Sequence, residues 1–209
     1  MAHKGECIDN PLTHQRIHYM QTAGETNGRT FEMRFEMFKG AFIVGGPHLH
    51  PAQTETFRCL KGKLRFVIAG KEQDLNEGEE FTVHPRTVHD WWNPSADQEA
   101  VALVRFEPAK RYEEYFETIF GLARDGKTNA RGFPRPLQAA VIYYDFRESV
   151  RAPKLWQRAL LTVALPPVAL IGKLFGYRSI YPAYRNRSNC PPGAEPIGTE
   201  AHADPGELP

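Results

Sequence analysis

The chain has 209 residues, a formal net charge of +1 and three cysteines, Cys7, Cys59 and Cys190. This length fits one domain with additions, or one domain and a small second unit. The near-neutral charge and the lack of helix-turn-helix or zinc-finger spacing argue against a nucleic-acid partner. An odd number of distant cysteines favours reduced thiols, and no apolar stretch typical of a secretion signal follows Met1. We therefore expect a cytoplasmic protein.

Residues 1–29 are polar and rich in turn-forming residues, so we expect a loose N-terminal arm with at most one strand, near residues 14–20. Residues 30–38 alternate apolar and charged side chains, which predicts a half-buried strand. The inner face of this strand is expected to carry Phe31, Met33, Phe35 and Met37. Residues 41–44 are expected to form a second, short strand.

Two histidines and a carboxylate follow at close spacing, with His48 and His50 one residue apart and Glu55 shortly after them. Side chains alternate between the two faces of an extended chain, so His48 and His50 can bind one ion together. A proline and small polar residues at 51–54 can turn the chain and bring Glu55 in from the next strand. His89 is the candidate fourth ligand. Imidazoles and one carboxylate suit a divalent first-row metal ion.

The chain after Glu55 is typical of short antiparallel strands joined by turns. Strands are expected at residues 56–60, 63–68, 80–84 and 100–107, with a short return strand through Leu75. Alternation from Glu55 places Phe57 and Cys59 on the inner face, where Cys59 would be a small buried hydrophobic residue. Gly62 and Gly78 stand where the chain reverses. This pattern predicts a β-sandwich or a small barrel.

The histidines and the carboxylate resemble the first sequence motif of the cupin superfamily. That motif pairs His-x-His with a glutamate and a glycine, which this chain supplies as His48, His50, Glu55 and Gly62. Phe42 stands where a glycine is usual. This departure concerns the geometry of a turn and not the ligands.

The segment that begins at Pro85 resembles the second cupin motif, with His89 as the fourth ligand and Asn93 as the usual asparagine. Thr87 replaces a glycine there. The resemblance implies a mainly β protein built on a double-stranded β-helix, the jelly-roll cupin barrel, over residues 30–108. It also implies a divalent metal ion, with Fe, Mn or Ni favoured over Zn, Co or Cu, and by analogy a homodimer.

Residues 109–187 are predicted to form a helical C-terminal extension, because periodicity changes at Pro108. Helices are expected at residues 110–124 and 137–146. Their aromatic side chains either close the mouth of the barrel or only cover the outer sheet. Residues 188–209 are rich in proline and glycine and are expected to be a disordered tail.

Residues 154–177 are the most apolar segment of the chain. The uncharged run at residues 159–172 is shorter than the roughly 20 residues that a membrane span needs, and Pro166 and Pro167 interrupt it. We expect a helical pair buried against the barrel or a second subunit. Alternatively, the segment contacts an anionic membrane surface or a greasy substrate, because basic residues outnumber acidic ones across residues 147–187.

Three histidines and one carboxylate leave two neighbouring positions of an octahedral metal ion open for substrate or dioxygen. An apolar pocket for the substrate is expected from Phe57, Phe66, Trp91 and Trp92. We expect an oxidoreductase of dioxygenase type that acts on a small hydrophobic or phenolic molecule, with Glu55 also able to carry a proton. The alternatives are a non-catalytic metal-binding or small-molecule-binding cupin, with or without membrane contact, and a metal-assisted isomerase or cyclase. His84 is expected to be structural or exposed.

Overall fold

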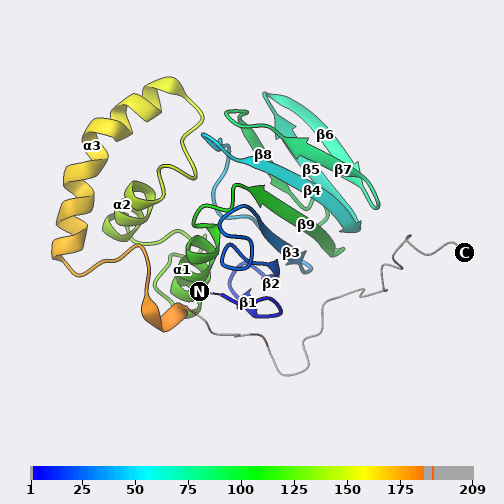
Figure 1. Ribbon diagram of the computed structural model, residues 1–209, viewed down its shortest axis with the longest axis horizontal. Coiled ribbons are helices and arrows are strands. Elements are labelled where there is room, and N and C mark those ends of the chain that lie inside the picture. Colours follow the sequence, from blue (N-terminus) through cyan, green and yellow to red (C-terminus); the bar gives the residue numbers. More distant parts are fainter. Residues whose placement is uncertain (1, 186–189, 191–209) are drawn as a thin grey trace, which may run out of the picture.

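The computed structural model describes residues 2–185 and Cys190, and it shows two antiparallel sheets followed by three helices (Figure 1). The first sheet has the strand order β1-β2-β3-β9-β4-β7, and the second has the order β6-β5-β8. The strands are β1 Cys7–Asn10, β2 Gln15–Gln21, β3 Phe31–Met37, β4 Thr54–Lys61, β5 Lys63–Ile68, β6 Lys71–Asn76, β7 Glu80–Val83, β8 His89–Trp92 and β9 Ala100–Glu107. The predicted fold class, mainly β with helices after the sheets, is confirmed.

Strand β3 runs antiparallel to β9, with Phe31 opposite Phe106 at one end of the pair. The predicted inner face is confirmed, since its four apolar side chains are all buried: Phe31, Met33, Phe35 and Met37. The other face is not exposed, however. Arg34 and Glu36 are buried there, and Arg34 Nε donates to Glu36 Oε1 at 3.2 Å. A charged residue on this strand is therefore no sign of contact with water.

The turn between β4 and β5 depends on Gly62, as we predicted from the sequence. Its φ is +75°, a left-handed value that residues with a side chain rarely adopt. A Cβ atom at this position would also lie 2.5 Å from the carbonyl oxygen of Glu99. Both observations explain why the chain has a glycine where it reverses direction.

The N-terminal segment is not the loose arm that we expected. It forms two strands, and β2 pairs with β3 from Gln15 to Gln21. Ile17 and Tyr19 of β2 are buried in the main core. The polar composition misled the prediction because only a few apolar residues are needed to extend a sheet whose neighbouring strand is already in place. The strand expected at residues 41–44 is also absent from the structure.

The expectation of three reduced cysteines is wrong. Cys7 of β1 and Cys190 form a disulfide, with their Cα atoms 5.7 Å apart, and Cys59 is buried as a free thiol. The two bonded cysteines are 183 residues apart in the sequence, so spacing alone could not reveal the pair. The cytoplasmic location rested partly on that expectation, and it stays a prediction. The disordered tail expected at residues 188–209 lies outside the described residues, Cys190 excepted.

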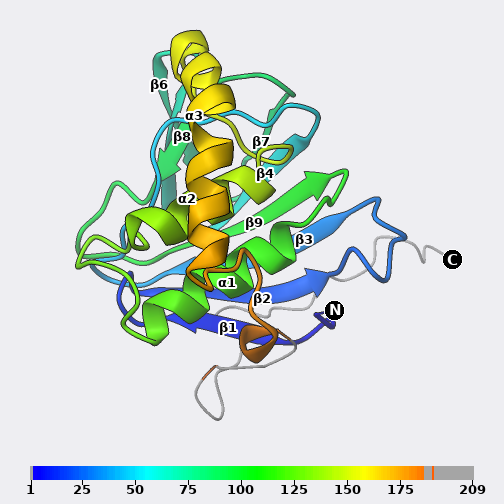
Figure 2. The same cartoon turned by 90° about the vertical axis from the view of Figure 1, so that its left-hand side faces the viewer.

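The helical segment contains α1 Tyr112–Arg124, α2 Pro136–Asp145, α3 Leu155–Leu174 and a short 3-10 helix, Pro182–Tyr184. The two predicted helices at residues 110–124 and 137–146 are confirmed as α1 and α2. Figures 1 and 2 show α3 as the outermost element, with α2 between it and the sheets. Gly172 of α3 permits this close packing, because a Cβ there would lie 2.7 Å from Cγ2 of Val141.

Helix α3 is continuous, although we expected a pair of helices broken at the two prolines. Pro166 and Pro167 lie inside its 20 residues. Prolines remove backbone donors, but the helix is largely exposed, so water can reach the carbonyl groups left unpaired. Within residues 2–185, α3 is the one helix long and apolar enough to cross a membrane, judged by length and composition alone.

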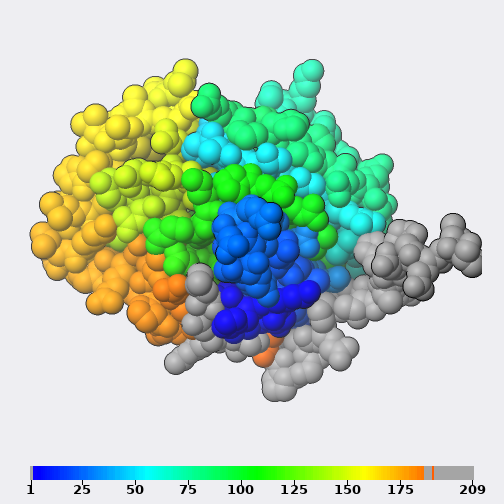
Figure 3. All heavy atoms as spheres, in the orientation of Figure 1, coloured from blue at the N-terminus to red at the C-terminus, as the bar shows by residue number. Residues whose placement is uncertain are grey.

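The outer face of α3 is apolar and open to solvent. In the space-filling view, this helix forms the left-hand edge of the molecule in yellow and orange (Figure 3). Val163 is 77% exposed and Leu174 is 79% exposed, and large apolar side chains between them are exposed as well. Of the residues of α3, Ala169 and Gly172 are buried, and the helix packs on α2 and not on the sheets, where we expected it.

Candidate metal centre

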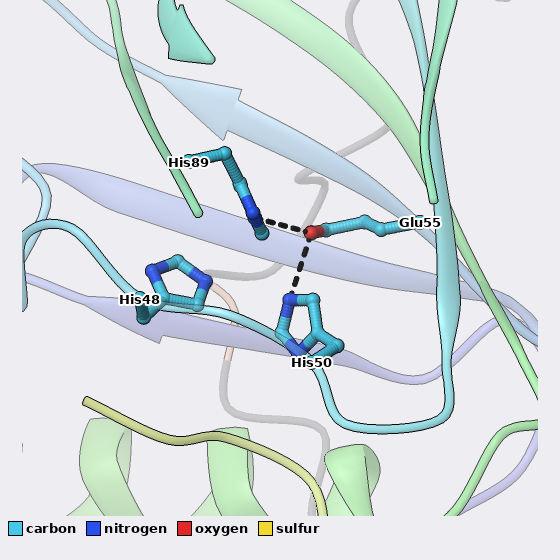
Figure 4. A group of neighbouring side chains, drawn as sticks. All are labelled: His48, His50, Glu55 and His89. Carbon is cyan, nitrogen blue, oxygen red and sulfur yellow. Dashed lines mark hydrogen bonds and ion pairs between the residues drawn. The ribbon is translucent and has the colours of Figure 1, made fainter. Parts of the chain in front are cut away.

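The four predicted ligands, His48, His50, Glu55 and His89, converge on one point (Figure 4). One donor atom from each lies within 4.8 Å of the donor atoms of the others. His48 and His89 are joined by two backbone hydrogen bonds of 2.9 Å, one in each direction. Glu55 comes from β4, where it pairs with Phe106 of β9 and Val83 of β7. Strand pairing in both sheets, together with the bridge between His48 and His89, thus fixes the positions of three separate chain segments.

The second nitrogen of each histidine bonds to a backbone carbonyl group. The Nδ1 atoms lie 2.9 Å from Gly46 O for His48, 2.8 Å from Ser149 O for His50 and 3.1 Å from Thr87 O for His89. A carbonyl oxygen can only accept, so each Nδ1 carries a proton and donates it. In a neutral imidazole, Nε2 then presents a lone pair. This is the arrangement by which proteins orient histidines that bind a metal ion.

The carboxylate of Glu55 lies close to two imidazole nitrogens that have no proton to donate to it when the imidazoles are neutral. Its Oε2 is 2.9 Å from Nε2 of His50 and 2.9 Å from Nε2 of His89. With both Nδ1 atoms protonated, neutral imidazoles would turn lone pairs toward a negatively charged oxygen. A positive charge among these atoms removes the conflict, either as a proton on an imidazole or as a metal ion. The set of three imidazole nitrogens and one carboxylate oxygen fits a divalent metal ion.

The charges within the cluster determine the protonation state of each of its members. Burial disfavours an ionised Glu55, but His50 and His89 outweigh it and keep the pKa of Glu55 well below its usual range. Burial and the neighbouring imidazoles His89 and His50 lower the pKa of His48 to about 4. Glu55 is therefore ionised and His48 is neutral at neutral pH. These are the states that metal ligation requires.

A cavity of about 850 Å³ opens beside the cluster and is lined by His48, His50 and Glu55. Of the four aromatic residues that we predicted to contact substrate, Trp91 lines it. Phe57 and Phe66 do not, because they are fully buried and pack with Trp91 in the core. Trp92 is also absent from the cavity wall. The strands also contribute Phe35 and Phe106, and helices α1 and α2 supply most of the rings, which are Tyr112, Tyr115, Phe116, Phe120, Tyr143 and Tyr144.

Several residues of the site could not be found from the cupin motifs. Tyr112 belongs to a predicted helix whose aromatic side chains were expected either to close the mouth of the barrel or to cover the outer sheet. Its hydroxyl group donates to Ser149 O at 3.1 Å and contacts Nδ1 of His50. Ser149 follows α2 and is 99 residues from His50 in sequence. His84, in contrast, is exposed and lies outside the cluster, as expected.

Residues 33–106 match the family model of the cupin domain. A curated relative, quercetin 2,3-dioxygenase of Bacillus subtilis (strain 168), is 31% identical over 112 residues, which make up 53% of this chain and 32% of the relative. This chain therefore spans about a third of the length of that relative.

Solved structures similar to this chain include two proteins that are each 16% identical to it. KdgF from Halomonas sp. has a TM-score of 0.43, and the match covers 51% of this chain and 89% of that one. An RmlC-like cupin from Shewanella frigidimarina NCIMB 400 has a TM-score of 0.41, with coverage of 51% and 86%.

The family match spans β3 to β9, the part of the chain that carries all four residues of the cluster. Both sequence motifs thus lie in one matched segment, and their donor atoms meet in space. The chain therefore contains a segment, residues 33–106, that matches the cupin domain and carries the whole candidate ligand set.

Proposed function

We propose that this protein is a metal-dependent oxidoreductase of dioxygenase type that acts on a small hydrophobic or phenolic molecule. The observation that carries the proposal is the shared cavity, which has metal-binding side chains on one wall and aromatic rings on the others. The similarity to a quercetin 2,3-dioxygenase over 112 residues supports the same reaction class. When bound, a divalent ion supplies Lewis acidity and positions for oxygen-donor ligands.

In this proposal the protein orients the substrate and limits the access of water. Tyr112 and Phe116 present flat surfaces against which an aromatic substrate can stack. Glu55 is a ligand first, because its lowered pKa favours the ionised form. The proton-carrying role that we predicted for Glu55 requires its carboxylate to loosen from His50 and His89.

Metal content is the first test. Untagged protein is expected to contain nearly stoichiometric iron, manganese or nickel by plasma mass spectrometry, and His48→Ala/His50→Ala protein is expected to have lost it. His84→Ala is the matched control, since this exposed histidine lies outside the cluster. Equal metal content in the wild type and the double variant would contradict the site assignment.

Oxygen uptake is the second test. Protein loaded with iron, manganese or nickel is expected to consume dioxygen with quercetin or a simpler phenol, and the double variant is expected not to. No uptake with any of these metals across the phenols would overturn the dioxygenase proposal. Turnover that continues without oxygen would instead indicate an isomerase or a cyclase.

We also propose that α3 contacts an anionic lipid surface. The support is its exposed apolar face, with no acidic residue in the helix and basic residues at Lys154, Arg158 and Lys173. Apolar side chains flanked by lysine and arginine are typical of helices that lie in a membrane interface. Because the inner side of α3 packs on α2, contact along the surface explains the structure better than a complete crossing.

Vesicle co-sedimentation tests this contact. Wild-type protein is expected to sediment with phosphatidylglycerol vesicles and much less with phosphatidylcholine vesicles. Leu160→Ser/Val163→Ser/Leu170→Ser protein, which loses three exposed apolar side chains, is expected to stay in solution. Absence of wild-type sedimentation would refute the contact, and membrane retention after extraction at alkaline pH would indicate a spanning helix.

A further inference from the structure

Three arginines line the cavity on its helical side. Arg147 follows α2, Arg151 lies in the connection to α3, and Arg158 lies in the first turn of α3. The sequence shows an excess of basic residues across residues 147–187, which suits contact with an anionic membrane surface. The cavity gives these three arginines a separate role.

The three guanidinium groups have no carboxylate partner among residues 2–185, whereas some other arginines of this protein do. Arg65 pairs with Asp74 and Arg105 pairs with Glu32. By contrast, the arginines of the cavity bond to neutral carbonyl groups. Arg147 Nη1 donates to Tyr144 O at 2.5 Å, Arg151 Nε donates to Arg147 O at 3.0 Å, and Arg158 Nη2 donates to Pro153 O at 3.4 Å. Arg147 also lies over the ring of Tyr144, 4.3 Å from its centroid, and no carboxylate of the described residues pairs with any of the three.

Arg158 also has a donor without a partner. Its Nε is buried and makes no hydrogen bond in the structure. A buried donor that lacks an acceptor is unfavourable, and a ligand oxygen would satisfy it. The acidic residues of the cavity wall do not supply this acceptor. They are Glu55, which lies among the histidines, and Asp90, whose Oδ1 accepts from the backbone N–H of Trp91 at 2.9 Å.

The arginine-bearing segment is fixed to the backbone of the metal cluster. Leu49 and Arg151 exchange two backbone hydrogen bonds, of 3.1 and 2.9 Å, and Leu49 lies between His48 and His50. Ser149 O, two residues before Arg151, accepts from His50. One ligand molecule can therefore meet both the cluster and the arginines in a cavity whose walls are held together.

We propose that Arg147, Arg151 and Arg158 form an arginine subsite that binds the carboxylate, sulfonate or phosphate group of the substrate. The body of such a substrate is apolar or aromatic and lies against the rings of the cavity. Guanidinium groups suit this role because their paired donors match the oxygens of such anions. The substrate class of the proposed oxidoreductase is then an amphipathic organic acid. The reaction in this inference rests on the proposed function, whereas the binding of an organic anion does not.

The test compares two fluorescent probes that share an aromatic body. 1-Anilinonaphthalene-8-sulfonate carries a negative charge, and N-phenyl-1-naphthylamine is its neutral counterpart. Titration of metal-free protein is expected to show that Arg147→Gln/Arg151→Gln/Arg158→Gln weakens binding of the sulfonate at least tenfold and leaves the neutral probe within twofold. The matched control, Lys4→Gln/Lys71→Gln/Arg131→Gln, removes three exposed charges outside the cavity and is expected to change neither.

Several results would overturn the arginine subsite. The first is an unchanged affinity for the sulfonate in the triple variant, and the second is an equal loss of this affinity in the control variant. The third is that Arg158→Gln weakens the binding of both probes equally while Arg158→Lys weakens neither. Since no turnover is measured, failure of the dioxygenase proposal would leave this result standing. A protein that oxidises only neutral phenols would conversely refute the subsite alone.

Discussion

Two apolar regions of this protein have opposite surroundings. In the sheets, Phe57 and Phe66 are completely buried, whereas Val163 and Leu174 of α3 are more than three-quarters exposed. The two regions share the same kinds of side chain. They differ because strand alternation aims one set of side chains inward, whereas α3 has more apolar surface than its packing on α2 can cover. Apolar composition therefore identifies a candidate interior but does not show what covers it.

Truncation of a core side chain should give the largest effect. Phe57→Ala is expected to lower the free energy of unfolding by about 3–5 kcal/mol, because it leaves a cavity next to Phe66 and Trp91. Leu170→Ala on the exposed face of α3 is expected to change it by less than about 0.5 kcal/mol. Urea denaturation measures both. Similar losses for the two variants would mean that α3 is covered in solution.

Crowding between α2 and α3 should lower the free energy of unfolding by an intermediate amount. Gly172→Val places atoms where Cβ alone would lie 2.9 Å from the carbonyl oxygen of Leu137, which is backbone and cannot move aside. We expect a loss of about 2 kcal/mol and faster hydrogen exchange in α3. Ala164→Val, on the exposed part of the same helix, is the control. Unchanged exchange in Gly172→Val protein would show that α3 does not depend on this packing.

Loss of one hydroxyl group should affect the metal cluster and spare the rest of the protein. Tyr112→Phe keeps the ring stacked on Phe106 but removes the contact with His50 and Ser149 O. The affinity for a divalent metal is expected to fall about tenfold, as for other residues that orient metal ligands. Competition with a chromophoric chelator measures this affinity, and Tyr143→Phe is the control. An equal decrease in both variants would argue against a specific role for Tyr112.

Acidification should cause the smallest change in the free energy of unfolding. The pKa of His48 is about 4 in the folded protein and 6.5 as its ordinary value, so between these pH values only the unfolded chain binds this proton. The contribution of His48 to the stability of metal-free protein is thus lost as the pH falls. His89 acts in the opposite direction, because Glu55 raises its pKa against the effect of burial.

Comparison with His48→Gln isolates the contribution of His48. Between pH 7 and pH 5 the wild type should lose about 1 kcal/mol more than this variant, a value reduced for the partial exposure of the side chain. Urea denaturation at both pH values, in the presence of a chelator, measures the difference. An equal loss in the two proteins would show that His48 takes up its proton over the same pH range in the folded and the unfolded chain.

Much of the sheet and the ligand set could be predicted because both depend on short-range pattern. Alternation over residues 30–38 gave the buried face of β3, and the spacing of His48, His50 and Glu55 gave three members of the cluster. His89 required the second motif. Its position then follows from a backbone pairing with His48 that a local pattern cannot show.

What could not be predicted depends on contacts between distant segments. The strands before residue 30 become stable only against β3, and the disulfide joins Cys7 to Cys190 across 183 residues. The predicted substrate wall was Phe57, Phe66, Trp91 and Trp92; of these Trp91 lines the cavity, and helices outside the cupin motifs supply most of its aromatic rings. Alternation shows which side chains point inward, but not which of them are covered by others.

The carbonyl group of Ser149 links two parts of the molecule that the family match separates. It accepts a hydrogen bond from His50, although the matched segment ends at residue 106. Because linkage is reciprocal, an ion that orders His50 also stabilises the chain between α2 and α3, and an event that loosens this chain weakens the hold on the ion by the same factor. A lipid surface bound to α3 would affect the metal ligands to the extent that it changed the order of this chain.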